Sequence, residues 1–300
     1  MKIKNSISRN VFLAINFIFL LASGLICILP FINLLAISMS DKYAVSSGRV
    51  GFWPVGFTLS SYSFILARND SFIKAFDISL LRVFLGIAIN LALIVLVAYP
   101  LSKDKKDFRG RTVISWFFVV TILFNGGMIP SYMIVRYTGL IDNILALILP
   151  GAIPVFSMLV VMNFFRGLPQ ELNEAAYIDG ANHIQTLIQI VLPISKPTLA
   201  TVGLFSIVGH WNAWFDGMLY MNQTSKYPLQ SYLRTVIINP ESFFRNSTNI
   251  AEDLQVFIQL VNARTMQAAQ LFLATIPVLL VYPFLQKYFT TGLVLGSVKG

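Results

Sequence analysis

The side chains that could do chemistry gather in one segment of an otherwise apolar chain, "EAAYIDGANHIQTLIQIVLP" (residues 174–193). It holds two carboxylates, one imidazole and several side-chain amides. No nucleophile–base pair accompanies them, and His183, His210 and Cys27 lack the spacing of a metal site. No glycine-rich Walker A loop is present either, so we do not expect the chain to bind ATP. These polar groups predict recognition of a partner rather than catalysis.

Local signals in residues 166–197 predict two short helices joined by a glycine turn. Pro169 suits the first helical turn because it lacks an N–H donor, and acidic side chains suit the positive end of the helix dipole. Gly180 is expected to end this helix in a left-handed conformation. Asn182 with Gln185 has the spacing of a capping box for the second helix. The second helix has an apolar stripe, formed by Ile184, Leu187, Ile188, Val191 and Leu192, and a proline is expected to stop it.

One face of this helical pair is apolar enough to lie on the chain's own spans, and the other face is polar. Small residues at Ala175, Ala176 and Gly180 would let a partner approach closely. We therefore interpret the segment as a docking surface for a cytoplasmic protein. The alternative is an amphipathic connector that rests on lipid headgroups. Such connectors are usually rich in Lys and Arg, whereas none lies between Arg166 and Lys196.

The elements that must position this segment are membrane spans. Of the 300 residues, 56% are hydrophobic and only 12% are charged, whereas soluble domains carry about 25% charged residues. We predict an all-α, polytopic membrane protein in which residues 1–300 form one transmembrane domain. Glycine and proline interrupt several of the apolar runs. The six expected spans cover residues 12–38, 77–102, 112–135, 144–165, 198–221 and 268–289.

The first apolar run is expected to be a retained span, because it is much longer than the core of a cleaved signal peptide. Lys and Arg concentrate before it and in the connection "KDKKDFRGR" (103–111), and such loops normally face the cytoplasm. An even number of spans puts both termini and the segment 166–197 on that side. The loops at 39–76, 136–143 and 222–267 then face outward. These basic segments contribute most of the formal charge of +9, and no nucleic-acid-binding motif is present.

The helical pair also resembles a known motif. Glu174-Ala175-Ala176, Gly180, Ile190 and Leu192-Pro193 fit the EAA signature of permease subunits in type I ABC importers. The stretches "VLPISKPTLA" and "GHWNAWFDGMLY" are similar to the sugar-importing branch that is related to the smaller maltose permease subunit. "FNGGMIPSYMIV" and "YPLQSYLRTVI" resemble a subgroup for complex oligosaccharides. The resemblance extends over nearly the whole chain and is most specific in the EAA region.

This resemblance implies a division of labour among subunits. Two related permeases would form the path of an oligosaccharide through the bilayer of a bacterial cell, and an extracellular solute-binding lipoprotein would deliver it. Two ATPase subunits would hold the ATP and Mg, since this chain would carry no cofactor. The helical pair would be the coupling helices, which sit in a groove of one ATPase. The residues expected there are Glu174, Ala175, Ala176, Asp179, Gly180, Ile190, Leu192 and Pro193.

Groups that could hold a sugar cluster near the end of the fifth span. Aromatic rings and an amide lie between His210 and Asp216, and the expected contacts are Trp211, Asn212, Trp214 and Phe215. Asn125 in the third span is a weaker candidate, named because polar groups within spans are functional candidates by default. Anchoring at the membrane interface is the alternative for the aromatic cluster. Arg82 and Asn90 are weaker candidates, and Arg82 could instead extend to the outer headgroups.

Two other transport functions stay open at this point. An ABC importer permease for a different solute, such as a peptide or an amino acid, would carry the same motif. A secondary transporter or channel would work without ATPases and would not need a docking surface. No inverted repeat of the kind common in such carriers is recognisable. An enzyme is the least favoured class, because the sequence offers no catalytic constellation.

Overall fold

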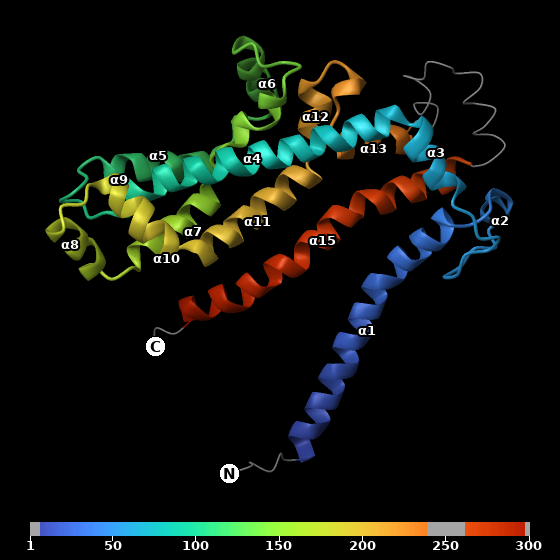
Figure 1. The fold of residues 1–300 in the computed structure, drawn as a ribbon, viewed down its shortest axis with the longest axis horizontal. Helices are drawn as coiled ribbons and strands as arrows, with labels where there is room; N and C mark the ends of the chain where they lie inside the picture. The colour runs from blue at the N-terminus through green and yellow to red at the C-terminus, as the bar shows by residue number, and fades with distance from the viewer. Residues whose placement is uncertain (1–6, 239–261, 298–300) are drawn as a thin grey trace. The chain divides into compact units, whose positions relative to one another are not determined.

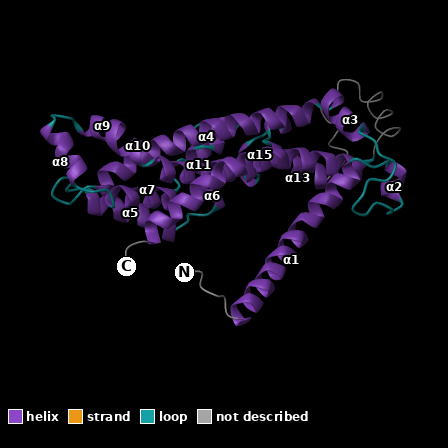
Figure 2. Cartoon of the chain, turned by 60° about the horizontal axis from the view of Figure 1, so that its bottom comes forward, coloured by secondary structure: helices purple, strands orange, loops and turns teal. Residues whose placement is uncertain are grey.

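The computed structural model describes residues 7–238 and 262–297, and every element within them is helical (Figures 1 and 2). The chain divides into two compact units, one of residues 1–73 and 235–276 and one of residues 74–234 and 277–300. Two long helices, α4 (Asp70–Ser102) and α15 (Ala263–Ser297), contribute to both units. The predicted all-α class is confirmed for the described residues.

In the first unit, α1 (Ile7–Ser38) turns its apolar side chains outward. Every residue from Ser8 to Ala22 is exposed, as expected of a helix that lipid surrounds. Only its last turns pack against other parts of the unit. Ile37 lies in a small apolar cluster with Val45 of α2 (Lys42–Ser46) and Ala268 of α15. A short helix, α3 (Ser60–Arg68), leads into α4.

The second unit has its core around α7 (Val155–Arg166). Met158 and Val161 of α7 are fully buried, in one cluster with Ile94 and Ala98 of α4 and with Val202 of α11 (Lys196–Asn212). Burial of a valine or methionine side chain contributes about 1.5–3 kcal/mol. This cluster fixes the segment after α7, which contains the predicted docking surface.

The remaining described elements between α4 and residue 239 are short. They are α5 (Arg111–Leu123), α6 (Met128–Tyr137), the 3-10 turns η1 (Ile144–Leu147) and η2 (Leu149–Gly151), α8 (Glu171–Ile178), α9 (His183–Thr186), the π-helical turn η3 (Leu187–Val191), α10 (Leu192–Ile194), α12 (Phe215–Tyr220), the 3-10 turn η4 (Thr224–Lys226) and α13 (Leu229–Ile238).

Three described helices are long and apolar enough to cross a membrane, at residues 8–38, 70–102 and 263–281. Two bent pairs raise the number of candidate spans to as many as five: residues 144–166, bent by 51°, and residues 183–212, bent by 82°. These five overlap the predicted first, second, fourth, fifth and sixth spans. The chain is thus an integral membrane protein by helix length and composition.

The predicted third span, 112–135, is divided between two shorter helices. α5 ends at Leu123, Phe124 is extended, and Gly127 has a φ of +87° just before α6 begins. Only a glycine adopts such a backbone conformation readily, so the "NGG" sequence enforces the break. Of the predicted outer loop, residues 239–261 lie outside the described residues, and the part before them forms η4 and α13.

Candidate functional site

The helical pair predicted within 166–197 is present, and its turn has the predicted conformation. Gly180 follows α8 with a φ of +77°, in the left-handed region. The Gly180 and Ala181 N–H groups donate to the carbonyls of Tyr177 and Ala176 at 3.0 and 2.9 Å. These bonds satisfy carbonyls at the end of α8 and fix the angle at which the chain enters the second helix.

The second helix starts at the predicted capping box and is longer than one turn. Gln185 N donates to Asn182 Oδ1 at 2.9 Å, and Asn182 N donates to Gln185 Oε1 at 2.8 Å. Helical structure then continues from α9 through η3 and α10 to Ile194. Pro193 does not end it at once, because a proline is tolerated in the first turn of α10. The 82° bend into α11 follows.

Exposed side chains on this helical pair form a surface that its own chain does not cover. Ile178 of α8 is 86% exposed, and Ile184 and Ile188 of the second helix are 67% and 56% exposed. The predicted apolar stripe is therefore only half buried, through Leu187 and Val191. Of the predicted contact residues, Glu174, Ala175, Asp179, Gly180 and Pro193 are exposed, Ile190 and Leu192 are partly buried, and Ala176 is buried.

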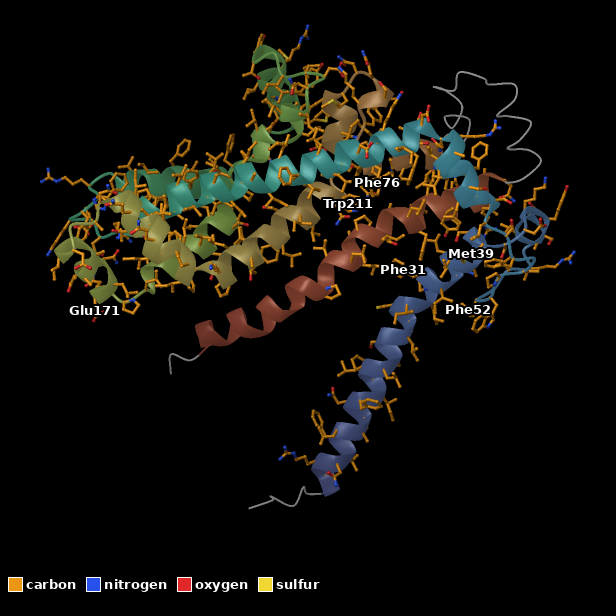
Figure 3. All side chains as sticks on the ribbon, in the orientation of Figure 1. Phe31, Met39, Phe52, Phe76, Glu171 and Trp211 are labelled. Atoms are coloured by element: carbon orange, nitrogen blue, oxygen red, sulfur yellow. The ribbon has the colours of Figure 1, made fainter. Side chains whose placement is uncertain are left out.

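Polar contacts attach the start of α8 to the end of α4. Lys103 Nζ, just after α4, donates to Asn173 Oδ1 at 2.7 Å. Arg166 donates to the carbonyl of Leu101 at 2.9 Å. In Figure 1, α8 and α9 lie at the end of the second unit where α4 finishes, and Glu171 lies at the tip of α8 (Figure 3). The helical pair is thus fixed to a long helix of the membrane domain.

Burial shifts the pKa values of two groups in and beside this attachment. Partial burial lowers the pKa of Lys103, an effect that the nearby Asp107 carboxylate partly opposes. The Lys103 ammonium also lies 4.5 Å from the centroid of the Tyr99 ring, a cation–π contact. Burial raises the pKa of Tyr177, whose hydroxyl forms a 2.9 Å hydrogen bond with His183 Nδ1. That last bond bridges the two helices across the Gly180 turn.

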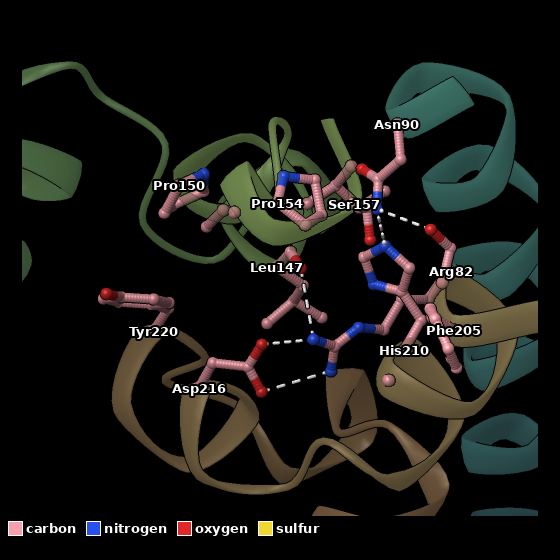
Figure 4. Close-up of a pocket in the computed structure, with 15 residues that line it drawn as sticks. Arg82, Asn90, Leu147, Pro150, Pro154, Ser157, Phe205, His210, Asp216 and Tyr220 are labelled. Carbon is pink, nitrogen blue, oxygen red and sulfur yellow. Dashed lines mark hydrogen bonds and ion pairs between the residues drawn. The ribbon is translucent and has the colours of Figure 1, made fainter. Parts of the chain in front are cut away.

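A second polar site lies within the membrane domain, where Arg82 of α4 joins three other segments (Figure 4). Its guanidinium forms a two-pronged ion pair with the carboxylate of Asp216 on α12. It also donates to the carbonyls of Leu147 and Ala213, at 3.1 and 3.3 Å. Arg82 is only 2% exposed, so it does not reach the outer headgroups. A bidentate pair of this kind compensates a charge that burial would otherwise make costly.

Asn90 lies two turns along the same helix and contacts α11. Its amide is within 3.2 Å of both Ser206 Oγ and His210 Nε2. All its neighbours are satisfied when the amide nitrogen donates to the carbonyls of Gly86 and Ala152 and the oxygen accepts from Ser206 and His210. Asn90 is 2% exposed. This network specifies how α4 and α11 pack.

Gly86 makes room for this packing. A Cβ atom at Gly86 would lie 2.4 Å from His210 Nε2, closer than any real contact. Gly203 lies on α11, about two turns before His210. A Cβ atom there would be at an ordinary 3.6 Å from Leu91 of α4. α4 and α11 therefore approach closely at His210 because position 86 has no side chain.

These two polar clusters line one cavity of about 490 Å³. Figure 4 shows the Arg82–Asp216 pair on one side of it and Asn90 with His210 on another. Its wall combines charged, amide, hydroxyl and aromatic groups with the backbone of two prolines. The lining residues are Arg82, Asn90, Ala146, Leu147, Ile148, Pro150, Gly151, Pro154, Ser157, Phe205, Ser206, Gly209, His210, Asp216 and Tyr220.

The lining of this cavity includes Arg82 and Asn90, two of the weaker candidates, but not Trp211, Asn212, Trp214, Phe215 or Asn125. Trp211 is buried and packs edge-on against Phe76, with ring centroids 5.7 Å apart (Figure 3). Trp214 contacts the Phe215 ring and lies 5.0 Å from the guanidinium carbon of Arg234. Asn212 is exposed. Asn125 is also exposed and accepts a hydrogen bond from Gly127 N in the break between α5 and α6. Sugar contact by these residues stays a prediction.

From the sequence alone, Arg82 and Asn90 rank as weaker candidates for sugar contact, and Asp216 is not among the expected contacts. The available signal was charge: an Arg and an Asp within apolar stretches need compensation, and each is the natural partner of the other. Their separation of 134 positions in the chain hid the pairing. The polar residues at the end of the fifth span were recognised as a group, but the three-dimensional contacts decide which of them face the cavity.

Comparison with known proteins adds to this geometry. No family model matches the chain. It is 39% identical over 282 residues to the polygalacturonan/rhamnogalacturonan transport system permease protein YtcP of Bacillus subtilis (strain 168), an alignment that covers 94% of this chain and 96% of the relative. It is 37% identical over 296 residues to protein LplC of the same organism, covering 99% of this chain and 97% of LplC.

A solved structure is also similar over nearly the whole length. It is the crystal structure of a bacterial ABC transporter involved in the import of the acidic polysaccharide alginate. One of its chains matches with a TM-score of 0.86 and 31% sequence identity, and the match covers 96% of this chain and all of that one (100%).

Proposed function

Because the chain belongs to the family of ABC transporter permeases, we propose that it forms half of the translocation path of an oligosaccharide importer and transmits the closure of an ATPase through residues 171–194. The observation that carries this proposal is the helical pair itself. Its first helix is attached to α4 by Lys103 and Asn173, while Ile178 and Glu174 on it are exposed. It thus has one side joined to the membrane domain and one side free for a partner.

The coupling step follows from this two-sided arrangement. A helix that seats in a groove moves with the groove. When ATP closes the two partner ATPases, the seated α8 is pulled along, and the attachment at Lys103 passes the movement to α4. The membrane domain then changes between two states of alternating access. In this scheme ATP and Mg bind the partner ATPases.

The complete transporter would contain four kinds of subunit. A second, related permease supplies the other half of the path, two ATPases lie on the cytoplasmic side, and an extracellular solute-binding lipoprotein delivers the substrate. The membrane domain would have six spans, with α5 and α6 together as the broken third span. Both termini would lie in the cytoplasm of a bacterial cell, as the basic residues of 103–111 favour.

The cavity at Arg82 and Asn90 supports an oligosaccharide as the substrate class. Sugars present many hydroxyl groups, and this wall offers amide, hydroxyl, imidazole and aromatic partners for them. Relatives of the chain are named for polygalacturonan, rhamnogalacturonan and alginate. A permease for a peptide or an amino acid is the second candidate. A carrier that works without ATPases would leave the exposed helical pair without a purpose.

Assembly of the complex tests the proposal. We would purify the chain with its genomically associated ATPase and compare the wild type with Glu174→Lys, which reverses an exposed charge on α8. Asp70→Lys is the matched control, because it makes the same change at an exposed residue at the opposite end of α4. We expect the first variant to insert normally but to lose the ATPase and uptake, and the control to keep both. Normal ATPase retention and uptake in Glu174→Lys would contradict the proposed docking surface.

A further inference from the structure

A compact loop follows α1 and displays large aromatic side chains. This aromatic loop comprises residues 39–59, between α1 and α3. The exposed fractions of its four aromatic residues are 72% for Tyr43, 51% for Phe52, 82% for Trp53 and 66% for Phe57. Leaving side chains of this size in water forgoes about 1.5–3 kcal/mol for each. Four of them in one short loop indicate a surface that something apolar covers.

Hydrogen bonds hold the aromatic loop in one shape. Asp41 N donates to the Val55 carbonyl and Thr58 N donates to the Met39 carbonyl, each at 3.0 Å, which closes the base of the loop. Gly56 has a φ of +65°, and a Cβ there would lie 2.9 Å from Cβ of Asp41. The turn therefore requires glycine. Because the base is fixed in this way, the aromatic rings are held outward.

The start of α15 gives the loop a second support. Asn262 Nδ2 donates to the carbonyl of Lys42 and to Ser46 Oγ, each at 3.0 Å. Val45 of α2 is buried in the cluster with Ile37 and Ala268. These contacts and the base of the loop lie in the same compact unit. The aromatic loop thus has a defined place beside the last turns of α1.

Asn33 fixes the depth of the loop along α1. Its side-chain nitrogen donates to the carbonyl of Gly51 at 2.7 Å, so the chain folds back past the end of the helix at Ser38. Figure 3 shows Phe52 beside the part of α1 that lies between Phe31 and Met39. Asn33 lies about 7.5 Å before the end of α1, at the helical rise of about 1.5 Å per residue.

The position of Arg9 before the apolar run of α1 allows the depth of Asn33 in the membrane to be estimated. Arg9 is the last basic residue before the apolar run that starts at Val11. About 20 residues cross the hydrocarbon core, so its far edge falls near Pro30. Asn33 then lies roughly 4.5 Å beyond that edge, among the lipid headgroups. Since Gly51 is bonded to Asn33, the neighbouring aromatic rings lie at the headgroup level too.

We propose that the aromatic loop is a membrane-interface anchor, which inserts Tyr43, Phe52, Trp53 and Phe57 into the headgroup region of the bilayer on the far side of α1 from Arg9. Trp and Tyr concentrate at this level because their rings are amphipathic, and the two Phe rings add apolar surface that lipid can cover. Arg49 is exposed in the same loop and can reach lipid phosphates with its guanidinium. The anchor would hold the outer end of α1 at a constant depth. This inference concerns lipid contact and does not depend on which solute is transported.

Fluorescence of Trp53 in the complete transporter gives the first test. The transporter with its partner subunits is placed in nanodiscs of phosphatidylcholine and phosphatidylglycerol. The emission of the wild type minus that of Trp53→Phe isolates this residue. We expect lipids brominated near the headgroup to quench the difference emission more strongly than lipids brominated at the chain end. Absence of quenching by both lipids would overturn the proposal.

A spin label provides an independent measurement that distinguishes lipid from protein. In a Cys27→Ser background, a nitroxide is attached at Phe57→Cys and, as the control, at Ser47→Cys, an exposed polar position of the same loop. We expect oxygen to collide with the label at 57 more often than a water-soluble nickel chelate does, and the reverse at 47. Shielding at 57 from both reagents would mean that protein covers it and would overturn the proposal. The proposal would also be overturned if the nickel chelate reached the label at 57 and only the loaded solute-binding protein blocked that access.

Discussion

Lys103 Nζ donates a 2.7 Å hydrogen bond to Asn173 Oδ1, and this bond joins the end of α4 to the first turn of α8. α4 also carries Arg82 and Asn90 of the polar cavity. Roughly 31 Å of helix separates Arg82 from Lys103, at about 1.5 Å per residue. One continuous helix therefore connects the group that would respond to an ATPase with the groups that would face a solute.

Replacement of Lys103 should weaken this connection. Lys103→Met keeps the length of the side chain and removes the donor to Asn173. A coupling free energy of about 1 kcal/mol corresponds to about a fivefold change. We expect ATPase stimulation by the loaded binding protein to fall by about that factor, with basal ATPase activity unchanged. Lys106→Met, at an exposed position of the same connection, is the control and should have no effect. Equal stimulation in both variants would show that the bond does not transmit the movement.

The ion pair in the cavity should behave as a buried pair whose partners depend on each other. Asp216→Leu leaves the guanidinium of Arg82, 2% exposed, without its counter-charge, and we expect a loss of about 3 kcal/mol. The double variant Arg82→Leu with Asp216→Leu removes both charges and should regain part of that loss. Thermal unfolding of the purified complex compares the wild type, Arg82→Leu, Asp216→Leu and the double variant. Strictly additive losses would mean that the two side chains do not stabilise each other.

The turn between the two helices of the proposed docking surface should tolerate asparagine better than other residues. Gly180 has a φ of +77° and open space around its Cβ position, so only backbone strain opposes a side chain there. Gly180→Val should cost roughly 1–2 kcal/mol and change the direction of the second helix. Gly180→Asn should retain most of the transport, because asparagine enters the left-handed region more easily. Uptake in cells is the measurement, and equal uptake for the two variants would contradict the role of the turn.

Acid should remove one stabilising contact in the predicted outer loops. The Lys226 ammonium bonds the carboxylate of Asp142 and lowers its pKa below the ordinary 3.8, with help from the Asn222 N–H group. Since the pKa is lower in the folded state, the contact stabilises the fold fully above the ordinary pKa. Its contribution is lost as the pH falls through the lowered value.

The size of this effect is that of an accessible ion pair, about 1 kcal/mol or less. We expect Lys226→Met to have a lower melting temperature than the wild type at neutral pH, and the two curves to converge in strong acid. Lys105→Met, at an exposed lysine with no part in this pair, is the control and should show no pH-dependent difference. A difference that persists unchanged in acid would indicate a packing effect rather than an ionic one.

Local signals made the helical pair of residues 171–194 predictable. The left-handed Gly180 and the reciprocal bonds of Asn182 with Gln185 depend on residues five or fewer positions apart, so local sequence is enough to predict them. The apolar runs likewise predicted an all-helical membrane domain. The exposure of Ile184 and Ile188 did not follow from the pattern, because an apolar stripe does not say whether its own chain or another molecule covers it.

Long-range contacts account for what sequence reasoning missed. The cavity needs Arg82 on α4 and Asp216 on α12 to meet, and no local rule connects these positions. The bends of 51° and 82° also depend on how helices pack, since proline and glycine mark where a helix can bend but not by how much. Trp211 illustrates the same point. Its aromatic ring is of a type that commonly contacts sugars, yet it is buried and packs against Phe76.

The bare backbone at Gly86 has a mechanical consequence. Because the His210 ring fills the space that a side chain at position 86 would take, any larger residue there would force α4 and α11 apart beside the cavity. Another part of the cavity wall is made by the 3-10 turn η2, which contains Pro150, and by Pro154, where the chain bends by 51° into α7. One wall of the cavity is therefore held by the close packing of α4 and α11, and another lies at a bend of the backbone. If solute passes through this cavity, we expect the segment of η2 and Pro154 to change its width more than α4 and α11 do.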